Sequence, residues 1–164
     1  MNGDSKVGIR FDLSNADVID FVRNYDFAWA RRQIVFDVET FRGLLIKAET
    51  GSLRDLTRAI QREFKLDLGI ADLLAQTESL RAANAVALAS YRKAGIEAVR
   101  WMADLPARCQ YCRALNNKQV AAGAPFLQPG EFSARRNGKP MIVFDPVCLP
   151  PLHFGCTCTI RAVV

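Results

Sequence analysis

The stretch that decides the fold is His153-Phe154-Gly155-Cys156-Thr157-Cys158, close to the C-terminus. It contains the single histidine of the 164-residue chain and two of its five cysteines. A second cysteine pair, Cys109-Gln110-Tyr111-Cys112, lies upstream of it. Ligands spaced by two residues are typical of zinc knuckles, in which a tight turn aims both ligand atoms at one ion. The two stretches therefore predict that a metal ion joins the ends of the long intervening loop.

Two ligand sets fit this spacing. The first set is Cys109, Cys112, His153 and Cys156, and three cysteines with one histidine suit a tetrahedral Zn2+ ion. If the last two cysteines lie in an extended segment, they point to the same side of the chain. In that case Cys158 replaces His153 in the second set, and His153 lies beside the ion without binding it. The sequence leaves both sets open.

The metal interpretation competes with buried thiols, disulfides and a redox pair. The N-terminal residues lack the apolar run of a signal peptide, and we expect the cysteines in a reducing cytoplasm, where clustered cysteines bind metals more often than they form disulfides. A thioredoxin-like pair lies at a helix start in a βαβ unit, whereas we expect a loop after Cys112. Cys148 lies among apolar residues and prolines, which predicts a buried core thiol.

The sequence lacks the residues that a catalytic zinc site requires. Zinc deaminases use His-x-Glu and Pro-Cys-x-x-Cys, but no glutamate follows His153 and Arg108 precedes Cys109. Helical metalloproteases use two histidines, and this chain has one. We therefore expect a structural Zn2+ ion, no small-molecule substrate and no enzyme activity.

Charge and pattern divide the chain into two parts. Residues 1–68 contain eleven Lys/Arg and eleven Asp/Glu, whereas residues 69–164 contain eleven and six, so the second part carries the whole formal net charge of +5. No stretch approaches the roughly 18 apolar residues of a membrane span. We predict an α+β chain: a helical N-terminal region over 1–68, and a domain over 69–164 that holds the zinc knuckle of residues 109–158 and short antiparallel strands.

Helical periodicity and turn residues place the secondary structure. The first helix begins after Ser14 or Asn15 and is kinked or split at Asn24-Tyr25-Asp26. Ser52-Leu53-Arg54-Asp55 has the form of a capping box before a second helix. A third helix covers about 70–94. Strands are expected at 99–102, at 141–144 after an Asn137-Gly138 hairpin-type turn, and at 157–164.

One face of the third helix carries a stripe of side chains, with two interpretations. The stripe is either a contact surface for a partner or for the zinc module, or a solvated surface with a Glu78–Arg81 ion pair. Its members recur at helical spacing: Thr77, Arg81, Asn84, Leu88 and Tyr91.

Two further groups of residues, one basic and one aromatic, can each be interpreted either as ordinary surface or core residues or as a binding surface. The basic pairs Arg31-Arg32 and Arg135-Arg136 fit a solvated surface, or a contact with DNA phosphates or acidic side chains. A group of aromatic residues in the first helical stretch fits a core, or an interface with another subunit if that helix projects. These aromatic residues are Phe21, Tyr25, Trp29, Phe36 and Phe41.

The order of these motifs resembles the phage head morphogenesis family, the minor head or Mu F-like proteins. The typical pattern of that family is an Arg-Thr-Glu helix, a Trp strand, a Cys-x-x-Cys and a closing Pro-x-His-Pro-Asn-Cys-Arg-Cys. The resemblance covers roughly 70–162. The matching residues here are Thr77-Glu78, Arg81, Asn84, Trp101, Cys109, Cys112, Pro151, His153, Cys156 and Cys158.

The resemblance implies a low-copy structural protein of a tailed phage or prophage. It implies association with the portal protein and other head proteins during assembly in the host cytoplasm, a place in the virion head, and association with packaged DNA or its ejection. No membrane contact is implied. A zinc-ribbon-like nucleic-acid-binding module is the alternative.

Four departures from the family pattern stand out. Gln76 replaces the usual arginine before Thr-Glu, and Asn117 stands where glycine often follows the second cysteine. Phe154-Gly155 replaces Pro-Asn, and Thr157 replaces arginine. None of these changes removes a proposed metal ligand.

Overall fold

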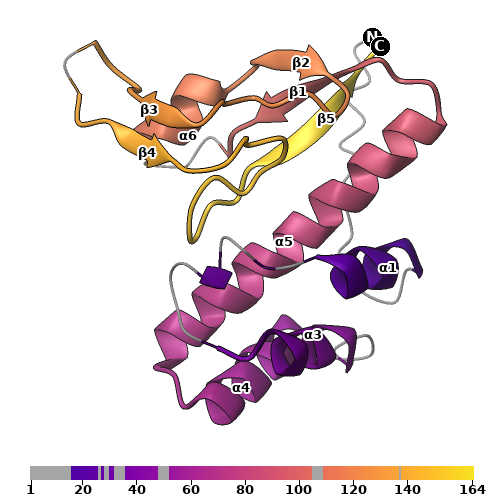
Figure 1. The fold of residues 1–164 in the computed structure, drawn as a ribbon, viewed down its shortest axis with the longest axis vertical. Coiled ribbons are helices and arrows are strands. Elements are labelled where there is room, and N and C mark those ends of the chain that lie inside the picture. Colours follow the sequence, from indigo (N-terminus) through magenta and orange to yellow (C-terminus); the bar gives the residue numbers. More distant parts are fainter. Residues whose placement is uncertain are drawn as a thin grey trace, which may run out of the picture.

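The chain folds as helices followed by short antiparallel strands, an α+β arrangement as predicted. A computed structural model describes residues 16–25, 27, 30–31, 36–47, 52–104, 109–136 and 138–164. In Figure 1 the helices α1, α3 and α4 lie at one end, the strands lie at the other, and α5 runs between them.

The first helical stretch is split, in agreement with the predicted break. Helix α1 covers Ala16–Asn24 and α3 covers Val38–Lys47. Phe27, which lies between them, has a φ of 52°, and a right-handed helix cannot continue through that conformation. The chain therefore turns back, so that both helices can pack on α5 and on one another.

Helix α4 covers Leu53–Phe64 and begins with the predicted capping box. The Ser52 hydroxyl accepts from the Asp55 amide at 3.3 Å, and the Asp55 carboxylate accepts from the Ser52 amide at 3.0 Å. These bonds satisfy two amides that the first turn of a helix leaves without partners. The Thr57 hydroxyl also lies 3.2 Å from the Asp72 carboxylate and so links α4 to α5.

The aromatic residues of the first helical stretch form a core, as the plain interpretation predicted. Phe41 is 0% exposed, and its ring contacts those of Phe27, Phe36 and Phe64. Full burial of one such side chain contributes about 1.5–3 kcal/mol. Trp29 lies outside the described residues.

Helix α5, Leu68–Lys93, contributes to two hydrophobic cores. Its first half packs against α1, α3 and α4 through buried residues such as Leu74. Its second half packs against the strand-bearing part through Leu88 and Tyr91. A helix of this length spans about 39 Å, which lets one element join both cores. The domain division after residue 68 stays a prediction, and α5 belongs to both packing units.

The larger sheet has the strand order β2-β1-β5, with both neighbours of β1 antiparallel to it. These strands are β1 (Ala98–Met102), β2 (Gln119–Ala121) and β5 (Thr159–Val163). Val99 and Trp101 are buried, while their neighbours in β1 are partly exposed. The sheet therefore has one face in the core and one outer face.

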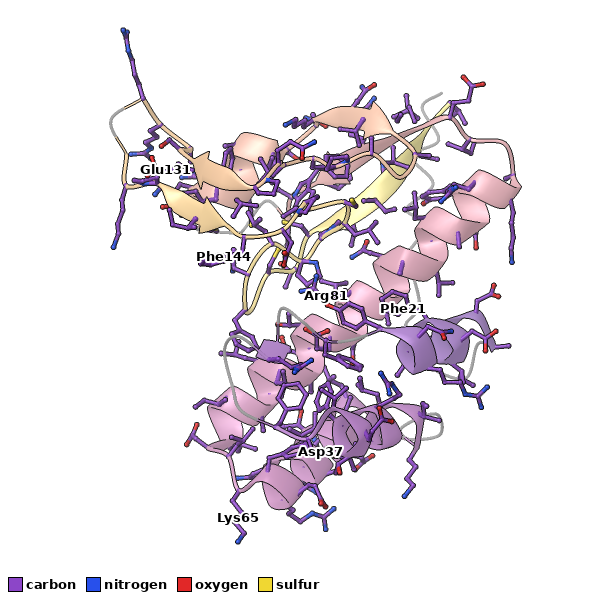
Figure 2. The ribbon with its side chains drawn as sticks, viewed as in Figure 1. Phe21, Asp37, Lys65, Arg81, Glu131 and Phe144 are labelled. Atoms are coloured by element: carbon purple, nitrogen blue, oxygen red, sulfur yellow. The ribbon has the colours of Figure 1, made fainter. Side chains whose placement is uncertain are left out.

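A hairpin formed by β3 (Gly130–Phe132) and β4 (Met141–Val143) extends from the core. The strand predicted at 141–144 is confirmed, and the chain turns within the connection of residues 133–140, where the Gly138 amide donates to the Arg135 carbonyl at 3.0 Å. Asn137 lies outside the described residues, so the turn at Asn137-Gly138 stays a prediction. A bridge between Leu127 and Val147 continues the ladder, so that 128–129 oppose 144–146 in a bulge. Figure 2 shows Glu131 and Phe144 on this hairpin.

None of the helices in the described part of the chain is long and apolar enough to cross a membrane.

The carboxylate of Glu78 is buried at the middle of α5. Its side chain is 0% exposed, and Arg81 Nε lies 3.3 Å from Oε2. Burial raises the pKa of Glu78, and the charge of Arg81 opposes this shift only in part. A raised pKa means that the ionised carboxylate destabilises the folded state. This destabilisation is absent at pH values below the pKa of Glu78 in the unfolded chain, and it is complete above the pKa of Glu78 in the folded chain.

We predict that Glu78→Gln raises the melting temperature at pH 7.5 by a few degrees. In a chain of this size, each kcal/mol of added unfolding free energy raises the melting temperature by about 2–4 °C. The gain should shrink as the pH falls toward 5, because the wild-type carboxyl is then increasingly neutral. Thermal melts at both pH values test this, with the exposed Glu131→Gln as the matched control. A lower melting temperature at pH 7.5 would show that the Arg81 pair outweighs burial.

Candidate metal centre

The first cysteine pair lies on the short helix α6, Gln110–Leu115. Cys109 is its N-cap residue and Cys112 lies one turn later, which places both on the same side of the helix. The loop predicted after Cys112 is therefore wrong. A helix of six residues between Gly-, Pro- and Asn-containing segments is too short to produce a helical sequence pattern.

The second group of donors lies on a turn. The Cys156 amide donates to the His153 carbonyl at 3.1 Å. Gly155 completes the turn with a φ of +67°, and a β-carbon at this position would lie 3.1 Å from Leu73 Cδ2. A larger residue here would be strained by its backbone and would press on α5. The turn thus brings His153 and Cys156 each close to Cys112.

The structure brings all five predicted donors together around Cys112. Cys109, Cys112 and His153 form one group of donor atoms, all within 4.8 Å of one another, and Cys112, Cys156 and Cys158 form a second. His153 Nε2 lies 3.1 Å from Cys109 Sγ and 3.2 Å from Cys112 Sγ. Cys112 Sγ lies 3.6 Å from Cys156 Sγ. This cluster of cysteines and histidine could hold a metal ion.

The histidine ring is oriented as in a metal ligand. His153 Nδ1 lies 2.7 Å from the Phe154 carbonyl oxygen, which can only accept a hydrogen bond. Nδ1 therefore carries the proton, and the lone pair of a neutral ring lies on Nε2, which faces the cysteines. Metal-binding histidines almost always donate their second ring nitrogen in this way.

The three buried thiols differ in acidity because they share one negative charge. Hydrogen bonds from Cys112 and Cys158 lower the pKa of Cys156 to about 2. The same bond to Cys156 is the main cause of a raised pKa at Cys112. For Cys158 the bond with Cys112 acts downward, but the bond with Cys156 and burial outweigh it and raise the pKa to about 11. These hydrogen bonds thus favour ionisation of Cys156 over ionisation of its two neighbours.

Three donor separations can be compared with those around a tetrahedral zinc ion, while Cys156 lies outside the group formed by Cys109, Cys112 and His153. Zinc–ligand bonds of about 2.3 Å to sulfur and 2.05 Å to nitrogen place two sulfurs about 3.8 Å apart and a sulfur and nitrogen about 3.6 Å apart. The observed separations of 3.6 Å and 3.1–3.2 Å lie within a few tenths of an ångström of these values. No carboxylate joins either group of donors in the described part of the chain.

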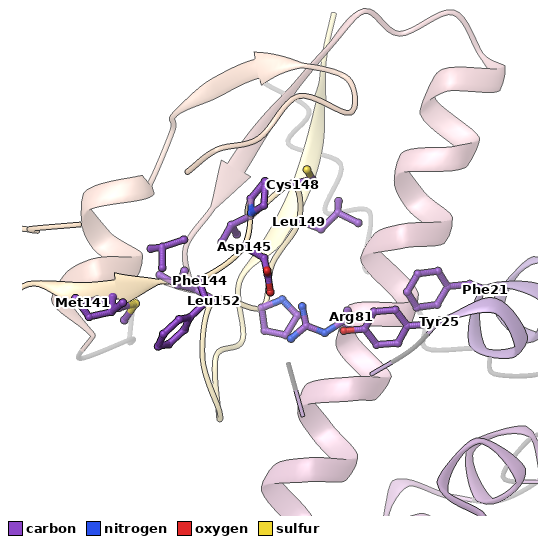
Figure 3. Close-up of a pocket in the computed structure, with 14 residues that line it drawn as sticks. Phe21, Tyr25, Arg81, Met141, Phe144, Asp145, Cys148, Leu149 and Leu152 are labelled. Atoms are coloured by element: carbon purple, nitrogen blue, oxygen red, sulfur yellow. The ribbon is translucent and has the colours of Figure 1, made fainter. Parts of the chain in front are cut away.

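Cys148 takes no part in the cluster and is half-buried, so the prediction of a buried core thiol is wrong. It lines a groove of about 300 Å³ between the segment 141–152 and helix α1. In Figure 3, Asp145 points toward Arg81 within this groove. The prolines around Cys148 direct the segment along the groove and not into the core. All five cysteines are free thiols.

The stripe on α5 contacts the strand-bearing part, which settles its interpretation. The Thr77 hydroxyl accepts from the Gly155 amide at 3.2 Å. The Asn84 amide group donates to the Cys158 carbonyl at 3.3 Å, and its oxygen accepts from the Ile160 amide at 3.0 Å. Helix α5 thus holds the metal-donor segment at both ends.

The basic pairs remain at the surface. Arg31 is exposed, and Arg32 lies outside the described residues. Arg135 and Arg136 are exposed in the connection between β3 and β4. Their predicted contact with phosphates or carboxylates stays a prediction.

Comparison with known proteins identifies no relative: the chain matches no protein-family model, no curated protein and no solved structure. Functional assignment therefore depends on the residues themselves.

We predict that Asn84→Leu weakens both the fold and the metal site. The substitution leaves the Cys158 carbonyl and the Ile160 amide buried without a partner, which costs about 1–3 kcal/mol for each group. Loss of the support behind Cys158 should also weaken zinc binding by about 10–100-fold, as for other groups that orient ligands. Thermal melts and competition with a zinc indicator measure the two effects. Gln76→Leu, which loses only a bond to Asp72 of the same helix, should leave zinc affinity unchanged.

Zinc binding should release protons and strengthen as the pH rises. The raised pKa of Cys112 keeps this thiol protonated at neutral pH, so a metal ion must displace its proton. We expect the affinity to rise about tenfold per pH unit for each proton released. Competition titrations between about pH 6 and pH 8 test this. An affinity that does not change over this range would contradict the assignment of Cys112 as a ligand.

Proposed function

We propose that the chain is a structural minor head protein of a tailed phage or prophage, in which a Zn2+ ion holds the strand-bearing part together. Cys109, Cys112, His153 and Cys156 would hold the ion, and Cys158 would lie beside them as a thiol. A bound zinc ion supplies coordinate bonds between segments that are far apart in the sequence. The partners would be the portal protein, other head proteins and packaged DNA.

The orientation of His153 supports the first ligand set over the second. Its protonated Nδ1 is bound to a carbonyl, and its Nε2 lies close to two sulfurs. Three cysteines and one histidine therefore complete a four-coordinate site.

A structural ion fits this environment better than a catalytic one. Catalytic zinc usually keeps one open position for water and has a general base nearby. Here five donors crowd around Cys112, and the described carboxylates lie outside both donor groups. We infer that the ion binds and crosslinks and has no catalytic role.

The main support for the family assignment is the backbone conformation at two positions, Asn117 and Gly155, where this sequence differs from the family pattern. Gly155 stands in place of asparagine and has a φ of +67°, and Asn117 stands in place of glycine and has a φ of 65°. Glycine and asparagine are the residues that most readily adopt this left-handed conformation. Both exchanges therefore preserve the local backbone that the family pattern requires.

The remaining motif residues support the same assignment. Thr77 contacts Gly155, and Asn84 contacts the backbone of Cys158. Trp101 and Cys158 are buried in the same hydrophobic core. Residues that the family pattern places in order along the chain thus form one connected unit.

The alternative, a zinc-ribbon-like nucleic-acid-binding module, is favoured by the excess of Lys and Arg in residues 69–164. Such a module would bind DNA without any head protein, and this binding would weaken with salt.

Metal analysis tests the proposal first. We predict one zinc ion per chain by native mass spectrometry, and loss of the ion in Cys109→Ser. That variant should lose protease resistance over residues 96–164 while the N-terminal helices stay folded. Cys148→Ser, which removes a cysteine from outside the cluster, should keep both zinc and resistance. A zinc-free chain that survives a strong chelator unchanged would overturn the proposal.

Head assembly tests the second part. The chain, expressed with the portal and head proteins of the phage that encodes it, should copurify with assembled heads at low copy number. Cys109→Ser should be lost from these particles, whereas Cys148→Ser should remain. A chain that stays outside the particles but binds DNA alone would favour the nucleic-acid module.

A further inference from the structure

The outer face of the β2-β1-β5 sheet carries two arginines side by side. The register pairs Arg100 of β1 directly with Arg161 of β5, and it pairs Arg100 with Gln119 of β2 on the other side. Directly paired residues point to the same face of a sheet, with β-carbons about 4.5–5.5 Å apart. The opposite face carries Val99, Trp101 and Ile160, which belong to the core and adjoin the metal donors.

This arrangement is unfavourable for the isolated protein. Like charges directly opposite one another destabilise a strand pair. Neither arginine has an acidic partner among the residues that the structure describes. In addition, Arg100 Nε is shielded from water and makes no hydrogen bond. The two guanidinium groups together place two positive charges on one face, so the pair is suited to an anion from outside the chain.

A carboxylate just beyond the end of β1 is already engaged. Asp104 accepts a hydrogen bond from the Thr157 hydroxyl at 3.0 Å, at the end of the strand pair. The surrounding part of the chain is also basic: residues 98–164 include seven described Lys/Arg and three Asp/Glu. Charge complementarity therefore favours an anionic partner.

The chemistry of the face distinguishes between anionic partners. Protein interfaces depend above all on aromatic anchors, and the described strands carry no aromatic residue on this face. The residues around the pair are Ala98, Met102, Gln119, Ala121, Thr159 and Val163, of which Met102 and Val163 are apolar and partly exposed. Affinity here would therefore come from charge. Contacts with the phosphate backbone of a nucleic acid depend on charge in the same way and do not depend on base sequence.

We propose that Arg100 and Arg161 bind the phosphodiester backbone of DNA on the outer face of the β2-β1-β5 sheet. Each guanidinium group presents paired N–H donors that match the oxygens of a phosphate group. The two arginines together would contact neighbouring phosphate oxygens of the DNA backbone. The inference rests on the part of the proposed function that brings the chain next to DNA. Since the arginines lie on the face opposite Trp101, their removal should leave the zinc site intact.

The test compares two double variants of equal charge in the full-length, zinc-loaded chain. Arg100→Gln/Arg161→Gln removes the pair, and Arg135→Gln/Arg136→Gln removes the same charge from the connection between β3 and β4. Binding of a fluorescent DNA duplex of mixed sequence is measured between about 50 and 200 mM salt. The first variant should weaken binding at least about tenfold and reduce the slope of log affinity against log salt by about 1.8. The second should retain most of the affinity.

Zinc content and portal binding are measured on the same variants, so that failure of this inference is distinguishable from failure of the proposed function. Equal loss of DNA binding in both double variants would mean that net charge alone is responsible, and would overturn the site. Unchanged binding in the first variant would also overturn it. Competition by poly-glutamate as effective as competition by unlabelled DNA would identify an acidic protein surface as the partner instead.

A stability measurement provides an independent readout. Arg100→Glu converts the unfavourable pair into an ion pair with Arg161, and should raise the melting temperature by about 1–3 °C while abolishing the DNA contribution of this face. A variant that loses stability and DNA binding together would point to a structural role for Arg100 and would contradict the proposal.

Discussion

The convergence of donor atoms on Cys112 is the constraint on which the strand-bearing part depends. Cys109 and Cys112 come from one short helix, and the other donors come from a turn near the C-terminus. The chain between them contains three short strands and much irregular backbone. Ordering such a segment costs conformational entropy that a small core does not offset. A metal ion held by these donors would supply the missing stabilisation.

Helix α5 transmits this constraint to the rest of the molecule. Thr77 and Asn84 bind the backbone on either side of Cys156, so that the position of the helix and the geometry of the donors are linked. The same helix contributes to the aromatic core around Phe41 through its first half. The two parts of the chain therefore share one rigid element, and loss of the ion should be felt first in the C-terminal part.

Much of this architecture could be predicted from sequence because the relevant signals are local. The capping box at Ser52, the break after Asn24 and the strand at Trp101 each depend on a few neighbouring residues. Ligand spacing likewise identified all five donors. Helix α6 was missed because six residues are too few for a periodic pattern. The proposed choice of His153 over Cys158 depends on the orientation of a ring, which no sequence pattern contains.

X-ray absorption at the zinc edge of the purified chain tests the central claim most directly. The account predicts three sulfur ligands at about 2.3 Å and one nitrogen ligand at about 2.0–2.1 Å, with no bound water. The spectrum of Cys158→Ser should be the same, since Cys158 lies beside the ion and not on it. Four sulfur ligands, a water ligand, or a chain that binds no zinc would contradict it.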